Sequence, residues 1–179
     1  MKTRMEPGLG NSEREPSLIT EVDMNDFINF NGVNLVKHDY NILTGIAKEY
    51  FHKTAEKYFS NLREASKLVY LHVEDKRVRR LDMCSQSLIE VPKGIDKLVN
   101  LSVLSLSSNQ IEDVSGLGNL VELERLYLGY NQIRDITGLG NLVNLELLGL
   151  SNNPNLDCNA WNNKKVIDEL KERECEVYL

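Results

Sequence analysis

The sequence predicts an α/β solenoid, in which short coils stack as a right-handed superhelix with a parallel β-sheet on its concave face. Asn109, Asn131 and Asn153 are 22 residues apart, and the string GLGNLV occurs twice, starting at Gly116 and at Gly138. The same apolar spacing also precedes each asparagine, at Leu101, Leu104, Leu106; Leu123, Leu126, Leu128; and Leu145, Leu148, Leu150. A fixed period of about 20 to 50 residues is typical of stacked units that bury their apolar faces against one another.

The apolar pattern continues behind the first two asparagines, at Ile111, Val114, Leu117, Leu120 and at Ile133, Ile136, Leu139, Leu142. The whole pattern, L-x-x-L-x-L-x-x-N-x-I-x-x-I-x-x-L-x-x-L, resembles the leucine-rich repeat. Its 22-residue form resembles the class found in phosphatase-regulatory and internalin-type proteins. A looser copy starts at Val78, is 23 residues long and has Gln86 in place of the asparagine, so the resemblance covers about residues 76–179.

Elementary structural chemistry explains the pattern. Side chains alternate between the two faces of a strand, so Leu104 and Leu106 are expected to face the core while Val103 and Ser105 face outward. The asparagine amides are expected to bond to buried backbone groups of the turn that follows, where an orphan group costs about 1–3 kcal/mol. We expect the glycines of GLGNLV to ease a tight return path on the convex side. The string is not a dinucleotide-binding fingerprint, because a valine stands where G-x-G-x-x-G requires its third glycine.

Four segments are expected along the chain, because a solenoid exposes its core unless both ends are covered. Residues 1–38 are expected to be largely disordered or loosely docked, with a short partner-binding segment as the alternative. Residues 39–76 are expected to form a helical N-terminal cap, of one helix or two, and a β-hairpin. Residues 77–156 hold the repeats. Residues 157–179 are expected to form a C-terminal cap of a helix and a short strand, with Trp161 packed against the exposed end of the third repeat.

Composition and charge exclude several classes of protein. A net charge of −6 argues against a nucleic-acid partner, which usually requires a basic patch. The chain shows neither a signal peptide nor an apolar run long enough to span a membrane. Cys84, Cys158 and Cys175 are odd in number and widely spaced, which favours reduced thiols and a cytoplasmic location, with a redox role for Cys84 or Cys158 as the alternative. No spacing indicates a catalytic residue, a metal site or a cofactor.

The residues expected to face outward from the sheet are the candidate binding residues: Arg80, Asp82, Val103, Ser105, Arg125, Tyr127, Tyr130, Leu147 and Tyr178. Among them Arg125, Tyr127 and Tyr130 are of the types most often found as interface anchors. The resemblance implies a monomeric, non-catalytic adaptor that binds another protein on the concave face. Its alternative is a regulatory subunit of an enzyme such as a protein phosphatase. A ribonucleoprotein-associated protein is a third reading, and the acidity counts against it.

Overall fold

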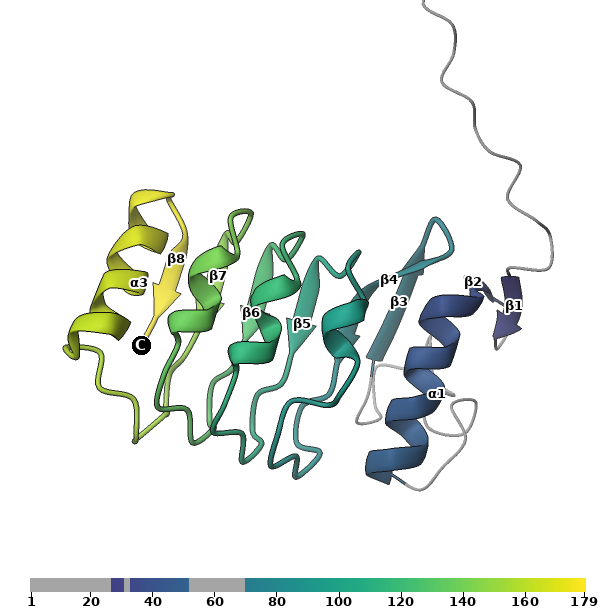
Figure 1. Ribbon diagram of the computed structural model, residues 1–179, viewed down its shortest axis with the longest axis horizontal. Coiled ribbons are helices and arrows are strands. Elements are labelled where there is room, and N and C mark those ends of the chain that lie inside the picture. The colour runs from purple at the N-terminus through teal and green to yellow at the C-terminus, as the bar shows by residue number, and fades with distance from the viewer. Residues whose placement is uncertain (1–26, 31–32, 52–69) are drawn as a thin grey trace, which may run out of the picture.

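The computed structural model describes residues 27–30, 33–51 and 70–179. Within them one sheet contains six strands: β3 (Tyr70–Glu74), β4 (Arg77–Asp82), β5 (Val103–Ser105), β6 (Arg125–Tyr127), β7 (Leu147–Gly149) and β8 (Glu176–Tyr178). The strands follow one another in chain order, as Figure 1 shows. β3 and β4 form an antiparallel hairpin, and each later strand pairs in parallel with the one before it. The molecule is therefore a solenoid with one parallel sheet along its length.

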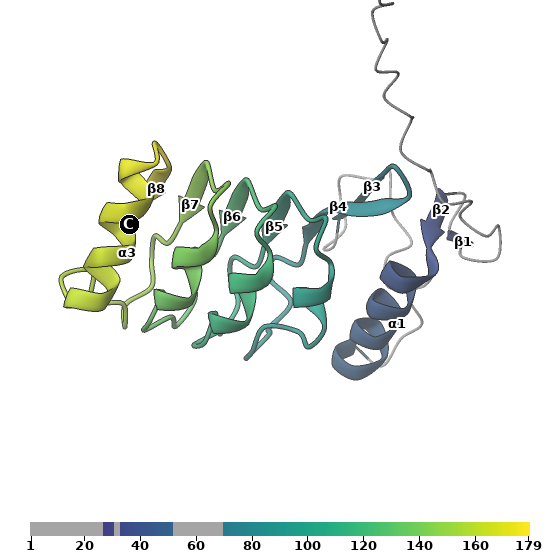
Figure 2. The same ribbon diagram turned by 45° about the horizontal axis from the view of Figure 1, so that its top comes forward.

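Short 3-10 helices stack in a second layer, on the opposite side of the coils from the sheet (Figures 1 and 2). They are η2 (Ile95–Lys97), η3 (Ser115–Asn119) and η4 (Thr137–Asn141). The leucines and isoleucines of the repeat fill the space between the two layers. Leu104 pairs with Leu126, and Leu126 with Leu148, and all three side chains are fully buried. Each coil therefore buries its leucines against the same positions of its neighbours.

Two of the repeated glycines, Gly118 and Gly138, allow a close approach between neighbouring coils. Among the described glycines only Gly94 has a positive φ, so the GLGN strings do not need glycine for a left-handed turn. A Cβ atom on Gly118 would clash with the carbonyl oxygen of Gly138, and one on Gly138 would lie 2.8 Å from the Cα atom of Ser115. The 3-10 helices of neighbouring coils approach so closely that only a hydrogen atom fits between them.

A β-hairpin and a helix precede the array. β1 (Phe27–Phe30) and β2 (Val33–Val36) pair in antiparallel fashion, and α1 (Lys37–Phe51) follows directly. Leu35 is fully buried, and the backbone N–H of Val36 donates to the carbonyl of Lys76 over 2.9 Å. This part of the segment expected to be disordered or loosely docked is therefore packed. Residues 1–26, 31–32 and 52–69 lie outside the described residues. The prediction of one helix or two in the N-terminal segment is therefore not tested beyond α1.

One buried carboxylate joins α1 to the first coil. Asp39, which is 2% exposed, accepts a hydrogen bond from the backbone N–H of Val78 over 3.0 Å and forms an ion pair with Arg77 over 3.2 Å. At the far end of the same helix, the Tyr50 hydroxyl donates to the Glu90 carboxylate over 2.9 Å. Both contacts hold α1 beside the first coil, in the position that Figure 1 shows.

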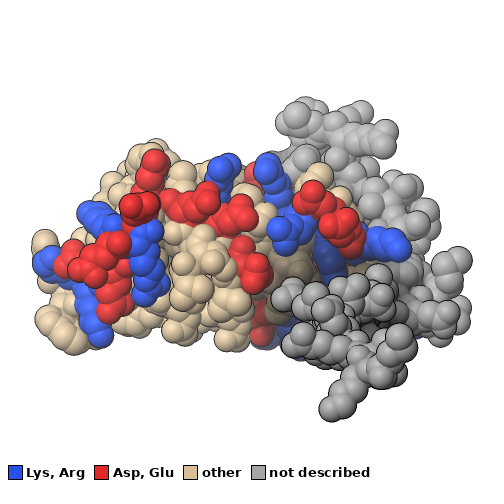
Figure 3. Space-filling view, turned by 90° about the horizontal axis from the view of Figure 1, so that it is seen from above, with Lys and Arg blue, Asp and Glu red and all other residues tan. Residues whose placement is uncertain are grey.

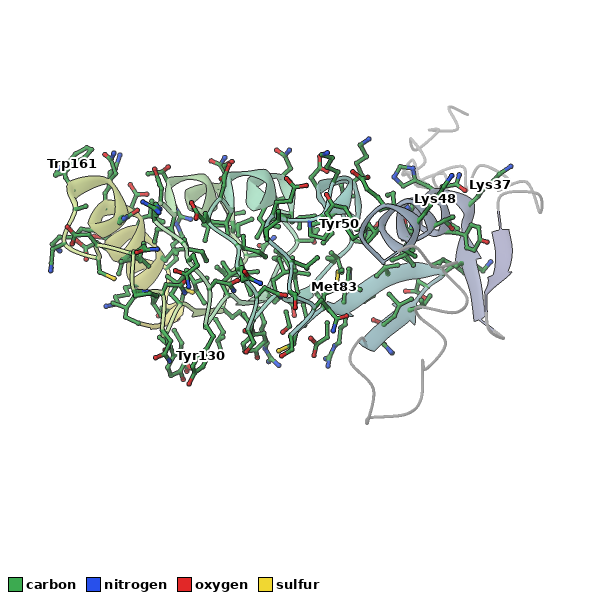
Figure 4. All side chains as sticks on the ribbon, turned by 90° about the horizontal axis from the view of Figure 1, so that it is seen from below. Lys37, Lys48, Tyr50, Met83, Tyr130 and Trp161 are labelled. Carbon is green, nitrogen blue, oxygen red and sulfur yellow. The ribbon has the colours of Figure 1, made fainter. Side chains whose placement is uncertain are left out.

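The helix α3 (Trp161–Glu172) and the strand β8 follow the last coil. Val166, Ile167 and Leu170 are buried, but the side chain of Trp161 is 75% exposed. The expectation that Trp161 packs on the end of the repeats is therefore wrong: the tryptophan lies at the outer end of α3, where Lys165 Nζ stands 5.7 Å from its ring centre (Figure 4). In the part of the chain that the structure describes, no helix is both long and apolar enough to cross a lipid bilayer.

Candidate partner-binding surface

Two columns of outward side chains run along the sheet, because the strands are in register and only their central residues point inward. The first column consists of Arg80, Val103, Arg125, Leu147 and Glu176, and the second consists of Asp82, Ser105, Tyr127, Gly149 and Tyr178. All ten residues are exposed or half-buried. The structure thus brings eight of the nine candidate residues into two adjacent rows on one face, and the ninth, Tyr130, lies beside them.

The first column holds two arginines without an acidic partner. The salt bridges formed by the described residues involve neither Arg80 nor Arg125. Val103 lies between them in the register, so the two Cα atoms are two strand spacings apart, about 10 Å. Asp82 forms no salt bridge with either arginine, and its carboxylate accepts the backbone N–H of Cys84 over 2.9 Å.

The second column holds two tyrosines with a glycine between them. Gly149 pairs with Tyr127 on one side and with Tyr178 on the other. The Tyr127 ring leans toward the glycine, so that its Cδ1 atom would lie 3.7 Å from a Cβ atom placed there. The Tyr178 hydroxyl donates to the Glu176 carboxylate over 2.8 Å, and this hydrogen bond is the main reason why the pKa of Tyr178 is raised. Tyr127 and Tyr178 therefore lie on the strands on either side of Gly149.

The turns after β4, β5, β6 and β7 each contain a residue in the left-handed conformation at the corresponding position. These are Ser85, Ser108, Tyr130 and Asn152, with φ between 57° and 61°. Asparagine adopts this conformation with little cost, whereas a bulky residue in it is an outlier. Tyr130 nevertheless holds it at φ 57°, and its side chain is 62% exposed. Figure 4 shows Tyr130 pointing away from the coils, on the side opposite the 3-10 helices. An exposed tyrosine at a strained position is a candidate for a contact residue.

The side-chain amides of the repeated asparagines form hydrogen bonds to the backbone of the turns that follow the strands. Asn131 Nδ2 donates to the carbonyls of Leu106 and Leu128, each over 3.0 Å, and its Oδ1 accepts the N–H of Ile111. Asn109 and Asn153 make equivalent bonds in their own coils, and all three side chains are at most 8% exposed. The turns that carry Ser108, Tyr130 and Asn152 are therefore fixed by hydrogen bonds to buried side chains.

One polar residue of this kind is missing from the sequence-based expectations. Asn163 in α3 is 4% exposed, and its amide bonds to the N–H of Ile136 and to the carbonyls of Arg134 and Asp157, over 3.0–3.1 Å. It supports the return path of the last coil from the following helix. The signal in the sequence is its spacing: Asn163 precedes Ile167 by four residues and Leu170 by seven, so the three share one face of a helix.

The rest of the described surface has fewer side chains suited to binding or catalysis. An open hollow of about 510 Å³ lies at the C-terminal end and is lined by Leu150, Asn152, Asn153, Pro154, Leu156, Cys158 and Leu179. Cys84, Cys158 and Cys175 are free thiols. Within the described ranges, no group of His, Cys, Asp and Glu side chains is placed to hold a metal ion.

Two family models for leucine-rich repeats match the chain, one at residues 76–133 and one, for two copies of the repeat, at residues 121–163. No curated protein is significantly similar in sequence. Among solved structures, an internalin from Listeria monocytogenes is 31% identical, with a TM-score of 0.41, over 63% of this chain and 29% of its own. A leucine-rich repeat protein of Leptospira interrogans is 30% identical, with a TM-score of 0.43, over 50% of this chain and 22% of its own.

The chain therefore spans less than a third of the length of these two proteins. The matched models begin at the β3–β4 hairpin and end in α3, so they cover every coil whose strands, asparagines and buried leucines are described above. Residues 76–163 of the chain are therefore leucine-rich repeats.

Proposed function

We propose that the protein is a non-catalytic adaptor that binds another protein on the outward face of its sheet. Leucine-rich repeat domains generally mediate protein–protein interaction. The observation that carries the proposal is the group formed by exposed Arg125, half-buried Tyr127 and exposed Tyr130 at the middle of the face, continued by Tyr178. Arginine and tyrosine are enriched among the residues that contribute most to binding energy, and they tend to lie near the centre of an interface.

The flanking elements are proposed to act as caps of the array, and the sheet face to be its concave side. α1 with the β3–β4 hairpin would cover the first coil, and α3 with β8 the last. The burial of Leu43, Ile46 and Leu71 in the first group and of Val166, Ile167 and Leu170 in the second supports this. A reducing, cytoplasmic setting is proposed as well, since the three cysteines of the chain are unpaired.

Affinity capture from a lysate of the source organism tests the binding surface. The full chain is the bait, and the test variant carries Arg125→Ala together with Tyr127→Ala. A matched control removes one basic and one aromatic side chain elsewhere, through Trp161→Ala together with Lys165→Ala in α3, where both residues are exposed. The test variant should lose its partner and the control should retain it.

The same captured material separates the alternatives. Phosphatase activity in the captured fraction would identify the partner as an enzyme and favour a regulatory subunit. Retention that is abolished by nuclease would favour a ribonucleoprotein component. If the Arg125 and Tyr127 double variant captures every protein that the parent captures, the sheet face is not the binding surface.

A further inference from the structure

We propose that the sheet face binds an amphipathic helix of a partner protein, in which two acidic side chains seven residues apart pair with Arg80 and Arg125. This inference rests on the proposed function, because it names the partner's chemistry at the same surface. It follows from the order of charges along the first column, from the spacing of the strands and from the two tyrosines on either side of Gly149.

The first column presents a defined order of chemistry. Along the array it reads cation, apolar, cation, apolar, anion, at Arg80, Val103, Arg125, Leu147 and Glu176. Both arginines are exposed, and neither forms a salt bridge in the described part of the chain, so both charges are free for an anion. Val103 and Leu147 are half-buried and offer apolar contact between the charges. A complementary partner presents acidic, apolar, acidic, apolar and basic side chains in that order.

The distance between the two arginines fits a helical ligand better than an extended peptide. Strands lie about 4.8 Å apart, so Arg80 and Arg125 are separated by about 9.6 Å along the array. A helix rises about 1.5 Å per residue, so residues i and i+7 on one face are about 10.5 Å apart. Residues i+3 and i+4 then lie over Val103, and residues i+10 and i+11 over Leu147. An extended chain along the array would place its sheet-facing side chains about 6.8 Å apart, which matches neither one strand spacing nor two.

The second column leaves room for such a helix. Gly149 has no side chain, and the rings of Tyr127 and Tyr178 stand on either side of it in the register. A Cβ atom on Gly149 would lie 3.7 Å from Cδ1 of Tyr127, so the Tyr127 ring stands beside the glycine. An apolar side chain of the helix above this column could pack against two aromatic rings, a side-chain type enriched among interface anchors.

A row of carboxylates beside the arginines argues against a polyanion. Glu124 and Glu146 directly precede Arg125 and Leu147 in the chain, and Glu176 is paired with Leu147 in the first column itself. Figure 3, which looks onto this edge, shows acidic side chains following one another, with basic ones beside them. A nucleic-acid backbone carries closely spaced negative charges and would lie against this row, whereas a helix with two separate carboxylates need not.

Selection from a displayed library tests the proposal. The library carries a fixed helical scaffold with randomised positions on one face, and the full chain is the target. The counter-target is the variant with Arg80→Glu and Arg125→Glu. The control carries Lys48→Glu and Lys171→Glu, an identical change of charge at two exposed lysines of α1 and α3. Unchanged thermal unfolding establishes that each variant is folded. Enriched helices should carry Asp or Glu at i and i+7 with apolar residues between them.

The selected helices are then measured as synthetic peptides. Their Kd should rise at least about tenfold on the arginine double variant and stay within about twofold on the lysine control. Moving the second acidic residue from i+7 to i+5, onto another face of the helix, should weaken binding by a similar factor.

Three results would overturn the inference. They are the enrichment of helices without the acidic pair, equal affinity for the arginine double variant, and selective binding of a mixed-sequence RNA in place of any helix. The proposed function fails separately. If the Arg125 and Tyr127 double variant loses its cellular partner while no acidic helix is selected, the sheet face is a binding surface of another specificity.

Discussion

Asn109 and Asn131, from neighbouring coils, donate hydrogen bonds to the same acceptor. The Nδ2 groups of both bond to the carbonyl oxygen of Leu106, over 2.8 Å and 3.0 Å. Asn131 and Asn153 share the carbonyl of Leu128 in the same way, over 3.0 Å each. A carbonyl oxygen has two lone pairs, so one group can serve its own coil and the next. The asparagines therefore join successive coils in addition to closing their own turns.

Replacing the middle asparagine by alanine should destabilise the whole array. Asn131→Ala leaves the carbonyls of Leu106 and Leu128 with one fewer donor and the N–H of Ile111 without its acceptor. A buried unsatisfied group costs about 1–3 kcal/mol, and some of the carbonyls keep other bonds. The free energy of unfolding, measured by urea titration, should fall by about 2–4 kcal/mol.

Asn144→Ala is the matched control. Asn144 is exposed and makes one hydrogen bond, from its Nδ2 to the carbonyl of Val121 over 2.9 Å. Water can replace that donor, so the free energy of unfolding should change by less than about 0.5 kcal/mol. Equal losses in the two variants would show that the buried ladder contributes no more than a surface amide.

Substitution of the glycines should separate close packing from backbone freedom. Gly118→Ala places a methyl group against the carbonyl of Gly138, so the coils must move apart. Overpacking of this kind costs about 1–3 kcal/mol. The control is Gly116→Ala, two residues earlier in the same 3-10 helix, where a Cβ atom would meet nothing within 4 Å. That substitution restricts the unfolded chain and should be neutral or stabilising by up to about 1 kcal/mol. Thermal unfolding of both variants measures the difference, and a destabilised Gly116→Ala would contradict the explanation.

The repeat spacing was sufficient to predict the solenoid and its family, because every coil buries the same positions. Leu104 and Leu126 stack in register as the period requires. The sequence could not reveal why Gly118 and Gly138 are glycines, because the reason is the distance between two coils. A glycine required by its own φ and a glycine required by a neighbour look the same in sequence.

The error at Trp161 has a geometric cause. A helix turns by about 100° per residue, so Trp161, nine residues before Leu170, points about half a turn away from it. Asn163 precedes Ile167 by four residues and Leu170 by seven, which puts it on the buried side with both. The burial of Trp161 was predicted from its residue type alone. Its position in the helical period instead places it on the exposed side of α3.

The sequence was sufficient to predict which residues of the candidate surface face outward. It was not sufficient to predict their ion pairs or backbone conformations. Strand alternation assigns Arg80, Arg125 and Tyr127 to the outward face. Whether a nearby carboxylate neutralises the arginines depends on side-chain positions. The left-handed conformation of Tyr130 is likewise visible only in the structure, because the other coils place serine or asparagine there.

The two faces of α3 should respond differently to truncation. Leu170→Ala removes a fully buried side chain and should lower the free energy of unfolding by about 2–4 kcal/mol. Trp161→Ala removes a side chain that is 75% exposed and should change it by less than about 0.5 kcal/mol. Because Trp161 is the only tryptophan, its fluorescence should already be that of a solvent-exposed indole in the folded protein and should shift little in urea. A large blue shift on folding would contradict its exposed position.

The buried thiol at the end of the array should make the protein less stable at alkaline pH. Burial raises the pKa of Cys175, and the Glu176 carboxylate raises it further. The folded state therefore holds the thiol proton more tightly than the unfolded chain does. This contribution to stability is fully present below the pKa of the unfolded thiol and is lost as the pH rises through the folded value. Cys175→Ala should flatten the alkaline side of the pH–stability curve, measured by urea unfolding between neutral and alkaline pH. In the folded parent protein an alkylating reagent should modify Cys84 before Cys175, and the reverse order in a mass-spectrometric time course would refute the protected position of Cys175.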